Sequence, residues 1–369
     1  MSRGKDALLA RARASVTAVD APAAFAFTGR RVLIDVREPA EVEDGTLPGA
    51  LCIPRGLLEL EIERQVDPRR PVMVFCAAGT RSLLAARTLL DMGFSDVVSL
   101  EGGIAAWKAA GGPIERPLRL DREDRARFAR HLTLAEVGEA GQLRLRAARV
   151  LVIGAGGLGS PAAYYLAAAG VGTLGLVDPD VVEVSNLQRQ ILHRTEDAGV
   201  LKVESARRAV EALDPRIRVE TFVERFDEDS AARILSGGWD CVVDGTDQTR
   251  ARYAISDAVT RAEIPLVHGA VHRFEGQVAL FGAPGPCYRC LFPVPPPPEA
   301  VPSCAEAGVL GVLPGIIGTL QALEALKVLL KLPTQPGRLL RFDAKQGRFE
   351  ALTVPRDPSC PACGDHTLQ

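Results

Sequence analysis

The residues from Gly154 to Gly159 carry the clearest chemical signal in the chain. They contain the spacing G-x-G-x-x-G at Gly154, Gly156 and Gly159, directly after the apolar run 150–153 and before a helix-forming stretch. Backbone N–H groups at the start of a helix bind phosphate. Asp178 ends the next apolar run, about 20 residues beyond the glycines, where a carboxylate can bind a ribose hydroxyl. The sequence therefore predicts a nucleotide site.

Polar side chains crowd the segment that follows Asp178. The loop 181–193 carries closely spaced amide and guanidinium groups, Lys202 begins an amphipathic helix, and Asp247 follows the apolar strand 240–244. Cationic side chains and a carboxylate that can hold Mg²⁺ stabilise charge on phosphates, whereas a hydride transfer does not need them. This favours adenylyl or phosphoryl transfer over an NAD-dependent oxidoreductase, which stays the alternative. The candidate residues are Ser185, Asn186, Gln188, Arg189, Gln190, Lys202, Asp247 and Gln248.

Cys76 is the candidate nucleophile of the N-terminal part. It lies between an apolar strand, 71–75, and a helix-forming stretch that begins near Arg81. Backbone N–H groups, the helix dipole and Arg81 are expected to lower the thiol pKa and to stabilise a thiolate or a persulfide. The alternative is a buried structural cysteine, an interpretation that fits Cys52 and Cys241.

Two C-x-x-C pairs lie about seventy residues apart, and four thiolates with this spacing are typical of structural zinc. A pair of redox dithiols is the alternative. Another cysteine, Cys304, follows the proline-rich loop 293–302 and is interpreted as either a reactive thiol or a spectator. The predicted zinc ligands are Cys287, Cys290, Cys360 and Cys363.

These residues need elements that position them, and strands alternate with helices along the whole chain. The pattern predicts an α/β protein: a small parallel-sheet domain over 1–115 and a Rossmann-like domain over 116–369. The second domain divides into an arginine-rich lead-in helix (118–148), a nucleotide fold (149–280) and a zinc knuckle with a thiol loop (285–365). A first helix is expected over 5–19. Arg144, Arg146 and Arg149 are expected at the surface.

The composition and the apolar segments limit the classes of protein to which the chain can belong. The chain has 369 residues, 47% of them hydrophobic, and a formal net charge of −2, which does not support nucleic-acid binding. The N-terminus lacks the apolar core of a signal peptide. The apolar region 308–330 contains Pro314, Gln321, Glu324 and Lys327, which indicates a buried helix rather than a membrane span. With no export signal, cysteines favour metal and thiol chemistry over disulfides. A cytoplasmic protein is expected.

The N-terminal domain resembles a single rhodanese (sulfurtransferase) domain. The resemblance rests on DVREP (35–39), the six-residue loop CAAGTR (76–81) and LEGGIAAW (100–107). It implies that Cys76 carries a persulfide while Asp35 and Arg37 brace the site. Thr46 stands where such domains commonly have a histidine.

The remainder, from about residue 125 to 364, resembles the MoeB/ThiF family of adenylyltransferases through GAGGLG, LVDPD, SNLQRQ, LKVES and DGTDQ. The resemblance implies that Gly157 contacts ATP and that Asp178 contacts its ribose. Arg189 and Lys202 would contact the phosphates, with Asn186 and Gln190 in support, and Asp247 would hold Mg²⁺. Gln248 stands where the family often has asparagine. Members of this family can link the carrier protein to a cysteine at the position of Cys304.

Residues 127–131 (RFARH) resemble a segment of enzymes that activate ubiquitin-like proteins. In those enzymes an arginine of this segment reaches the nucleotide of the other subunit. The resemblance therefore implies a homodimer in which Arg130 acts as an arginine finger.

Together the two resemblances imply an enzyme that uses MgATP to adenylate the C-terminal Gly-Gly of a ubiquitin-like sulfur carrier. The Cys76 persulfide, loaded by a cysteine desulfurase or thiosulfate, would then give a thiocarboxylate for molybdopterin, thiamine or thiolated-tRNA synthesis. The sulfurtransferase domain is N-terminal here, whereas well-known fusions carry it at the C-terminus. Two other functions stay open: a tRNA-modifying member of the superfamily, and a binding module with inert Cys76 and Cys304.

Overall fold

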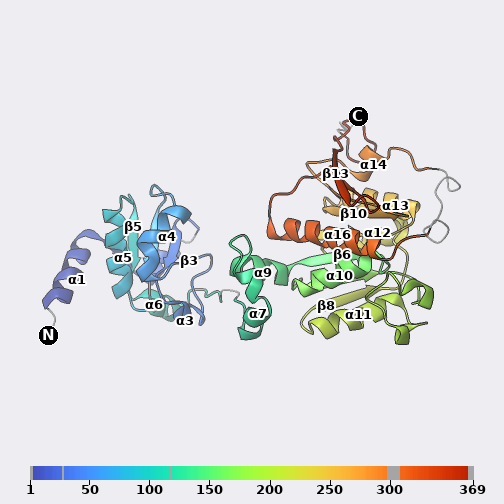
Figure 1. Ribbon diagram of the computed structural model, residues 1–369. Coiled ribbons are helices and arrows are strands. Elements are labelled where there is room, and N and C mark those ends of the chain that lie inside the picture. Colours follow the sequence, from blue (N-terminus) through green and yellow to red (C-terminus); the bar gives the residue numbers. More distant parts are fainter. Residues whose placement is uncertain (1–2, 27–28, 117–118, 297–307, 365–369) are drawn as a thin grey trace. The chain divides into compact units, whose positions relative to one another are not determined.

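The computed structural model describes residues 3–26, 29–116, 119–296 and 308–364 of the chain. The chain divides into two compact units, Met1–Arg119 and Leu120–Gln369. In the part that the structure describes, each unit is built on a sheet with helices packed on both faces (Figure 1). The predicted α/β fold class is confirmed.

The first unit has a sheet of five parallel strands in the order β1-β5-β4-β2-β3. The strands are β1 (Thr17–Val19), β2 (Val32–Asp35), β3 (Leu51–Cys52), β4 (Val72–Phe75) and β5 (Val97–Leu100). The helices are α1 (Arg3–Ser15), α2 (Ala21–Phe25), α3 (Pro39–Val42), η1 (Arg55–Leu57), α4 (Leu58–Gln65), α5 (Thr80–Asp91) and α6 (Gly103–Ala109).

Strand β4 lies in the middle of this sheet and is covered on both faces. Val72 and Val74 belong to the core cluster that includes α4 and α5, whereas Met73 and Phe75 belong to the cluster that includes α2 and α6. A strand buried on both faces is expected to be apolar throughout, as this one is. Cys76 follows directly after β4 and therefore lies at the carboxyl end of a central strand.

The predicted helix 5–19 is wrong at its C-terminal end. Helix α1 ends at Ser15, and Thr17–Val19 pairs in parallel with β5 as an edge strand. The β-branched residues favour a strand, and the hydrogen bonds that select it come from β5, about eighty residues away in the sequence.

The second unit has an eight-stranded sheet in the order β13-β12-β11-β10-β9-β6-β7-β8, parallel from β8 to β10 and antiparallel from β10 to β13. The strands are β6 (Arg149–Ile153), β7 (Thr173–Val177), β8 (Arg218–Phe222), β9 (Cys241–Asp244), β10 (Leu266–His272), β11 (Glu275–Phe281), β12 (Arg338–Asp343) and β13 (Arg348–Thr353). The helices are α7 (Arg122–Arg127), α8 (Ala129–Leu132), α9 (Gly138–Ala147), α10 (Gly159–Ala168), η2 (Val184–Asn186), η3 (Thr195–Asp197), α11 (Lys202–Leu213), α12 (Glu228–Leu235), α13 (Thr249–Arg261), α14 (Tyr288–Leu291) and α16 (Val312–Leu330).

Helix α16 is long and apolar enough to cross a membrane by length and composition alone. In the structure Leu313 and Ile317 pack in the same core cluster as β6 and α10. The buried amide of Gln321 donates to the carbonyl oxygens of Asp244 and Val267, at 2.6 and 3.2 Å. An amide that bonds two strands of the sheet agrees with the interpretation of this segment as a core helix.

The arginine-rich lead-in folds as three short helices, α7, α8 and α9, rather than as one. Arg146, expected at the surface, is only 14% exposed. Its guanidinium forms ion pairs with Asp124 (2.5 Å) and Asp214 (2.7 Å) and lies over the ring of Phe128. The surface expectation is wrong for Arg146, because its partners come from other segments of the chain.

Candidate functional site

The glycine loop, residues 154–159, joins β6 to α10 and leaves no room for side chains at its two ends. Gly154 has a φ of +93°, a conformation that glycine adopts without strain. A Cβ on Gly159 would lie 1.7 Å from the carbonyl oxygen of Gly154. The two ends of the loop therefore pack directly against the chain's own backbone, and the loop lies at the carboxyl edge of the parallel strands, where such folds bind nucleotides.

Asp178, at the end of β7, is 6% exposed and holds the loop. Its carboxylate accepts the N–H of Ala155 at 2.8 Å and the N–H of Asp180 at 2.9 Å. Burial raises the pKa of Asp178, although Lys202 and these two N–H groups oppose the shift. The predicted ribose-binding residue thus also positions the backbone of the glycine loop.

The two predicted phosphate-binding cations have polar partners that a phosphate can replace. The Lys202 ammonium donates to Asp180 at 2.9 Å and lies 4.0 Å from Asp178. The Arg189 guanidinium donates to the side-chain oxygen of Asn186 at 2.9 Å and to the carbonyl of Ser185 at 3.4 Å. Asn186 therefore orients Arg189 in this structure.

Arg189 and Gln190 border the glycine loop. A Cβ built on Gly157 would lie 3.5 Å from Cδ of Arg189, and one on Gly156 would lie 3.7 Å from Nε2 of Gln190. Gln190 is 4% exposed, and its side-chain oxygen has no hydrogen-bond partner among the described residues. Such an orphaned acceptor fits a site that a polar ligand completes. Gln188 lies further along, within 2.2 Å of a Cβ built on Gly311.

The loop after β9 carries Asp247 and adjoins the glycine loop, since a Cβ on Gly245 would lie 2.9 Å from the N–H nitrogen of Gly159. The Asp247 side chain is exposed, so it is available to a metal ion. Gln248 is exposed as well and accepts from Arg225 at 3.3 Å. The predicted positions of these two side chains at a strand end agree with the structure, and their roles stay predictions.

Asp244, directly before this loop, forms a buried pair that the sequence analysis did not single out. It accepts from Nδ1 of His268 at 2.9 Å and from the hydroxyl of Thr246 at 2.7 Å. Burial alone would raise the pKa of Asp244, but these hydrogen bonds outweigh it and lower the pKa. His193 is a second buried histidine that was missed. For His268 the available signal was a histidine within the otherwise apolar segment 266–271, whereas His193 lies in a polar segment that gives no such signal.

Arg130 lies in α8 and is exposed. Its side chain has no hydrogen-bond or ion-pair partner among the described residues of its own chain. This agrees with the prediction that Arg130 acts on a second copy, and the role itself stays a prediction.

Cys76 follows β4, and its sulfur lies where a helix begins. The thiol accepts the N–H of Gly79 at 3.1 Å. Burial raises the pKa of Cys76, but the N–H and hydroxyl groups of Ser82 and the N–H groups of Ala78 and Gly79 outweigh burial, so the pKa is lowered. The loop therefore stabilises a sulfur anion with its own backbone.

The glycine pair Gly102-Gly103 allows a second chain segment to reach this loop. A Cβ on Gly103 would lie 2.2 Å from the carbonyl oxygen of Cys76, and Ile104 donates its N–H to the same oxygen at 2.8 Å. This close approach explains Gly103, whereas a Cβ on Gly102 would instead lie 2.6 Å from Cβ of Ala106 in its own helix.

Asp35 and Arg37 form a buried ion pair with an N···O distance of 2.7 Å. Arg37 also donates to the carbonyls of Glu41 and Gly45, at 2.8 and 2.7 Å, and so holds the segment around α3. Thr46, at the position where a histidine is common, donates its hydroxyl to Asp35 at 2.7 Å. Thr46 therefore has a structural partner in this pair.

Arg81 is predicted to stabilise the thiolate. In the structure its guanidinium pairs with Glu41, and the hydrogen bond to Glu41, with a smaller contribution from the nearby Cys76 sulfur, raises the pKa of Arg81. Two hydrogen bonds of 2.6 Å join Arg81 to Glu41. The hydrogen bond from Arg81 lowers the pKa of Glu41 to about 2. The braced α3 segment thus holds Arg81 beside the Cys76 loop.

Besides Cys76, two cysteines outside the C-x-x-C pairs lie among the described residues, and they differ from each other. Cys241 is fully buried in β9, and burial raises its pKa to about 12, so its interpretation as a core residue is confirmed. Cys52 is exposed, and the same interpretation is wrong for it, because β3 is the short edge strand of its sheet.

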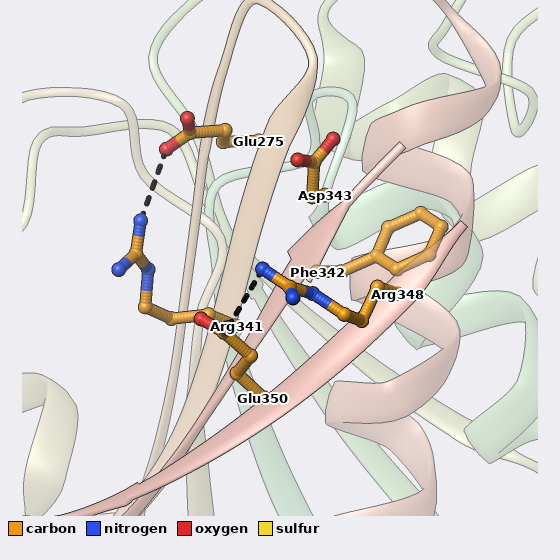
Figure 2. Close-up of a pocket in the computed structure, with 6 residues that line it drawn as sticks. All are labelled: Glu275, Arg341, Phe342, Asp343, Arg348 and Glu350. Carbon is orange, nitrogen blue, oxygen red and sulfur yellow. Dashed lines mark hydrogen bonds and ion pairs between the residues drawn. The ribbon is translucent and has the colours of Figure 1, made fainter. Parts of the chain in front are cut away.

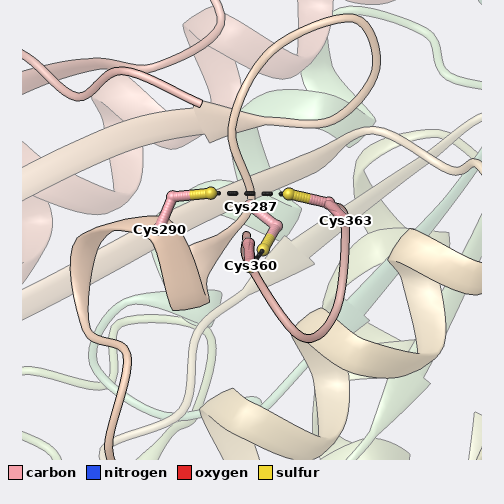
Figure 3. A group of neighbouring side chains, drawn as sticks. All are labelled: Cys287, Cys290, Cys360 and Cys363. Atoms are coloured by element: carbon pink, nitrogen blue, oxygen red, sulfur yellow. Dashed lines mark hydrogen bonds between the residues drawn. The ribbon is translucent and has the colours of Figure 1, made fainter. Parts of the chain in front are cut away.

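The four C-x-x-C cysteines converge in the structure (Figure 3). The sulfurs of Cys287 and Cys360 are 3.6 Å apart, those of Cys290 and Cys363 are 3.4 Å apart, and all four lie within 4.8 Å of one another. A tetrahedral zinc ion with Zn–S bonds of about 2.3 Å requires sulfurs roughly 3.8 Å apart. The cluster therefore fits a four-thiolate metal site.

Cys304 lies outside the described residues. The hollow shown in Figure 2 lies on β11, β12 and β13, away from the glycine loop. Its charged side chains already pair with one another, Arg341 with Glu275 and Arg348 with Glu350. It therefore presents no additional site for the predicted chemistry.

Comparisons with known proteins agree with the two predicted domains. The model of the ThiF family matches residues 128–362, and the model of the rhodanese-like domain matches residues 23–110. Both resemblances inferred from the motifs are confirmed.

Among curated proteins, the chain is 51% identical over 259 residues to the "Sulfur carrier protein adenylyltransferase" of Thermus thermophilus, covering 68% of this chain and 95% of that protein. It is 45% identical over 254 residues to the "Probable adenylyltransferase/sulfurtransferase MoeZ" of Mycobacterium tuberculosis, covering 67% of this chain and 64% of that protein.

Among solved structures, a crystal structure of E. coli MccB matches with a TM-score of 0.58 at 20% identity, covering 65% of this chain and 75% of that chain. At this identity the match supports the fold alone.

Proposed function

The chain belongs to the ThiF family, and on that premise we propose that it adenylates the C-terminal glycine of a ubiquitin-like sulfur carrier with ATP. We propose further that the rhodanese-like domain supplies the sulfur that converts this glycine to a thiocarboxylate. The relatives named for these two activities support the proposal.

One observation carries the adenylation proposal. The glycine loop is bordered by Asp178, Arg189, Gln190 and the loop that bears Asp247, and Lys202 lies 4.0 Å from Asp178. In adenylation, a carboxylate oxygen attacks the α-phosphorus of ATP, and pyrophosphate leaves. Charge accumulates on the phosphate oxygens, where Lys202 and Arg189 would stabilise it. Asp178 would bind the ribose.

Two metal ions belong to the proposal. Asp247 would hold Mg²⁺, with its exposed carboxylate beside the glycine loop, and this ion would neutralise charge on the phosphates. Cys287, Cys290, Cys360 and Cys363 would hold Zn²⁺, which would stabilise the fold by joining α14 to the C-terminal segment.

The sulfur step would begin with a persulfide on Cys76, whose loop stabilises a sulfur anion. The terminal sulfur would attack the acyl carbon of the adenylated glycine, and AMP would leave. An external thiol would then attack the Cys76 sulfur, so that the thiocarboxylate leaves and a disulfide with Cys76 forms, which a further external thiol would reduce. Cys304 would be the thiol that can form a covalent link with the carrier. Tethering both domains in one chain raises the local concentration of the sulfur donor.

The proposal includes a homodimer, in which Arg130 reaches the nucleotide of the second copy. It also includes a cytoplasmic location, and a cysteine desulfurase or thiosulfate as the source of sulfur for Cys76. A monomer in light scattering would contradict the role of Arg130.

The test is ATP–pyrophosphate exchange with and without sulfur carriers that end in Gly-Gly. Exchange that depends on one carrier, and that disappears when its terminal glycine is removed, is the expected result. No exchange with any carrier, together with normal thiosulfate sulfurtransfer, would contradict adenylation and leave only the activity of the first domain.

The zinc assignment is tested by metal analysis of the purified protein. We expect one zinc per chain and its loss in Cys360→Ser, whereas the matched variant Cys52→Ser keeps it. Retention of zinc by Cys360→Ser would contradict a four-cysteine site. So would more than four freely titrating thiols in the native protein, because four of its eight cysteines lie outside the cluster.

A further inference from the structure

His193 lies beneath the glycine loop and is 6% exposed. Its Nε2 is 2.9 Å from the carbonyl oxygen of Ala155, and its Nδ1 is 2.9 Å from the hydroxyl of Ser205. Ala155 lies within the glycine loop, and Asp178 accepts its N–H. His193 and Asp178 therefore hold the two polar backbone groups of one loop residue from opposite sides.

The contacts continue from His193 as a chain of hydrogen bonds. The hydroxyl of Ser205 is 2.7 Å from Oδ2 of Asp197, and Oδ1 of Asp197 accepts from Arg208 at 2.8 Å. Ser205 lies in α11, the helix that begins with Lys202. These hydrogen bonds thus join the glycine loop to helix α11, which begins with Lys202, the predicted phosphate-binding lysine.

This series of hydrogen bonds contains three short contacts: His193 to the Ala155 carbonyl, His193 to Ser205, and Ser205 to the Asp197 carboxylate. Each contact needs one proton. The carbonyl and the carboxylate are acceptors only. Ser205 supplies one proton and a neutral imidazole supplies one. With a neutral His193, two protons serve three contacts, so one contact in the series from Ala155 to Asp197 lacks a proton. All three bonds form only when both ring nitrogens of His193 donate.

The third proton belongs on the imidazole. Burial raises the pKa of Asp197, but hydrogen bonds from Ser205 and the N–H of Arg194, with the charge of Arg208, outweigh burial and lower that pKa. For His193, burial and the charge of Lys202 outweigh the hydrogen bond to the Ala155 carbonyl and the charges of Asp178 and Asp197, so the pKa is lowered. The ring therefore takes the third proton only when this balance of charges changes.

The ionisable groups around His193 therefore come from three elements. They are Asp178 and Asp180 after β7, Asp197 in η3, and Lys202 and Arg208 in α11. Lys202 is the group among them whose charge a nucleotide would offset, because phosphates are its predicted ligands.

We propose that His193 is a positioning residue of the nucleotide site that takes up a proton from solvent when phosphates bind beside Lys202. The added proton completes the hydrogen bonds from Asp197 to the Ala155 carbonyl and holds the glycine loop in its binding conformation. This inference rests on the proposed function, since it requires a nucleotide at that loop.

The test is the NMR titration of the histidine ring protons, which is practicable because the chain has five histidines. His193→Gln identifies the His193 signal. The titration runs from about pH 5.5 to pH 8.5, where histidine changes charge, with and without a magnesium complex of an ATP analogue methylene-bridged between the α and β phosphates.

We expect the bound analogue to raise the His193 midpoint by about one pH unit, the size of shift that one nearby charge produces. The exposed His272 is the internal control and keeps its midpoint. Binding without a shift overturns this inference and leaves the proposed function standing. Absence of binding overturns the proposed function and this inference with it.

Variants separate positioning from general support of the fold. Ser205→Ala breaks the link to Asp197 but leaves the imidazole, the carbonyl and Lys202, and we expect a lower His193 midpoint both with and without the analogue. His193→Leu is expected to weaken analogue binding about tenfold, whereas His193→Gln, which retains an N–H donor, restores most of it. Equal affinity of His193→Leu and the unaltered protein would overturn the positioning role.

Discussion

The Cys76 loop and the glycine loop share one backbone arrangement, and each is predicted to stabilise a different anion. Each follows the carboxyl end of a central parallel strand and leads into a helix. At Cys76 the anion is part of the chain, and the sulfur accepts the N–H of Gly79 at 3.1 Å. At the glycine loop the predicted anion is an external phosphate. There, Lys202 and Arg189 bond to Asp180 and Asn186.

The difference shows how each site can be assembled. A sulfur anion within the chain is stabilised by groups a few residues away, so the first site is mostly local in sequence. An external anion needs cations with replaceable partners, and these come from several elements around the loop. Activity at the first site should therefore depend mainly on one atom, the Cys76 sulfur. Activity at the second site should depend on many groups, and the loss of each should have a smaller effect.

The largest expected effect is that of Cys76→Ala. It removes the sulfur, so thiosulfate–cyanide sulfurtransfer should fall at least about a thousandfold. Carrier-dependent ATP–pyrophosphate exchange should be unchanged. Cys52→Ala, which removes the exposed sulfur of the same unit, is the control and should keep full sulfurtransfer. Appreciable activity in Cys76→Ala would mean that another group carries the sulfur.

Asp247→Ala should have the next largest effect. Loss of the carboxylate assigned to Mg²⁺ should reduce ATP–pyrophosphate exchange by about a hundredfold or more, with no change in sulfurtransfer. Asp229→Ala, which removes an exposed carboxylate from the start of α12, should exchange normally. If exchange survives in Asp247→Ala, the metal role assigned to this residue is wrong.

The two loops should also differ in their tolerance of a methyl group. Gly159→Ala places a Cβ 1.7 Å from a backbone oxygen and should lower the free energy of unfolding of the second unit by about 3 kcal/mol or more. Gly79→Ala, with a φ of +88° and its nearest atom at 3.0 Å, should cost the first unit about 1–2 kcal/mol.

Gly315→Ala is the control for this pair, because no atom lies within 4 Å of its Cβ and helix α16 favours alanine there. It should not destabilise the protein in denaturant unfolding followed for each unit. Equal losses in Gly159→Ala and Gly79→Ala would contradict the difference between the loops.

The smallest expected effect is that of Glu41→Gln, which removes the partner of Arg81. Both side chains are about one third exposed, at 36% and 35%, so screening limits the loss at neutral pH to about 1 kcal/mol or less. The folded-state pKa of Glu41 is lowered from 4.5 to about 2, so its contribution is present above pH 4.5 and is lost as the pH falls towards 2.

The difference in unfolding free energy between Glu41→Gln and the unaltered protein should therefore shrink over this acid range. A difference that is constant with pH would contradict the ion-pair explanation. Sulfurtransfer should change little, because the Cys76 sulfur keeps the N–H groups of its loop.

Much of the fold follows from patterns that are local in the sequence. The apolar runs 150–153 and 71–75 are buried strands because each is covered on both faces, and close backbone contacts require Gly154 and Gly159. The C-x-x-C spacing also indicated a metal site, because the two cysteines of each pair are near neighbours in the sequence.

Contacts between distant segments were not predictable in this way. The edge strand Thr17–Val19 needs β5, and the burial of Arg146 needs Asp124 and Asp214. In the candidate site, the partner of Arg81 proved to be Glu41, forty residues earlier in the chain. No spacing rule indicates such pairs.

The sequence by itself determined the two domains, the two loops that are predicted to bind anions and the residue types available to each, because these depend on neighbours along the chain. The tertiary structure alone decided which polar groups meet: His193 with Ala155 and Ser205, and His268 with Asp244. The physical reason is burial. A buried polar group must find a hydrogen-bond partner, and the packing of the elements decides which one is within reach.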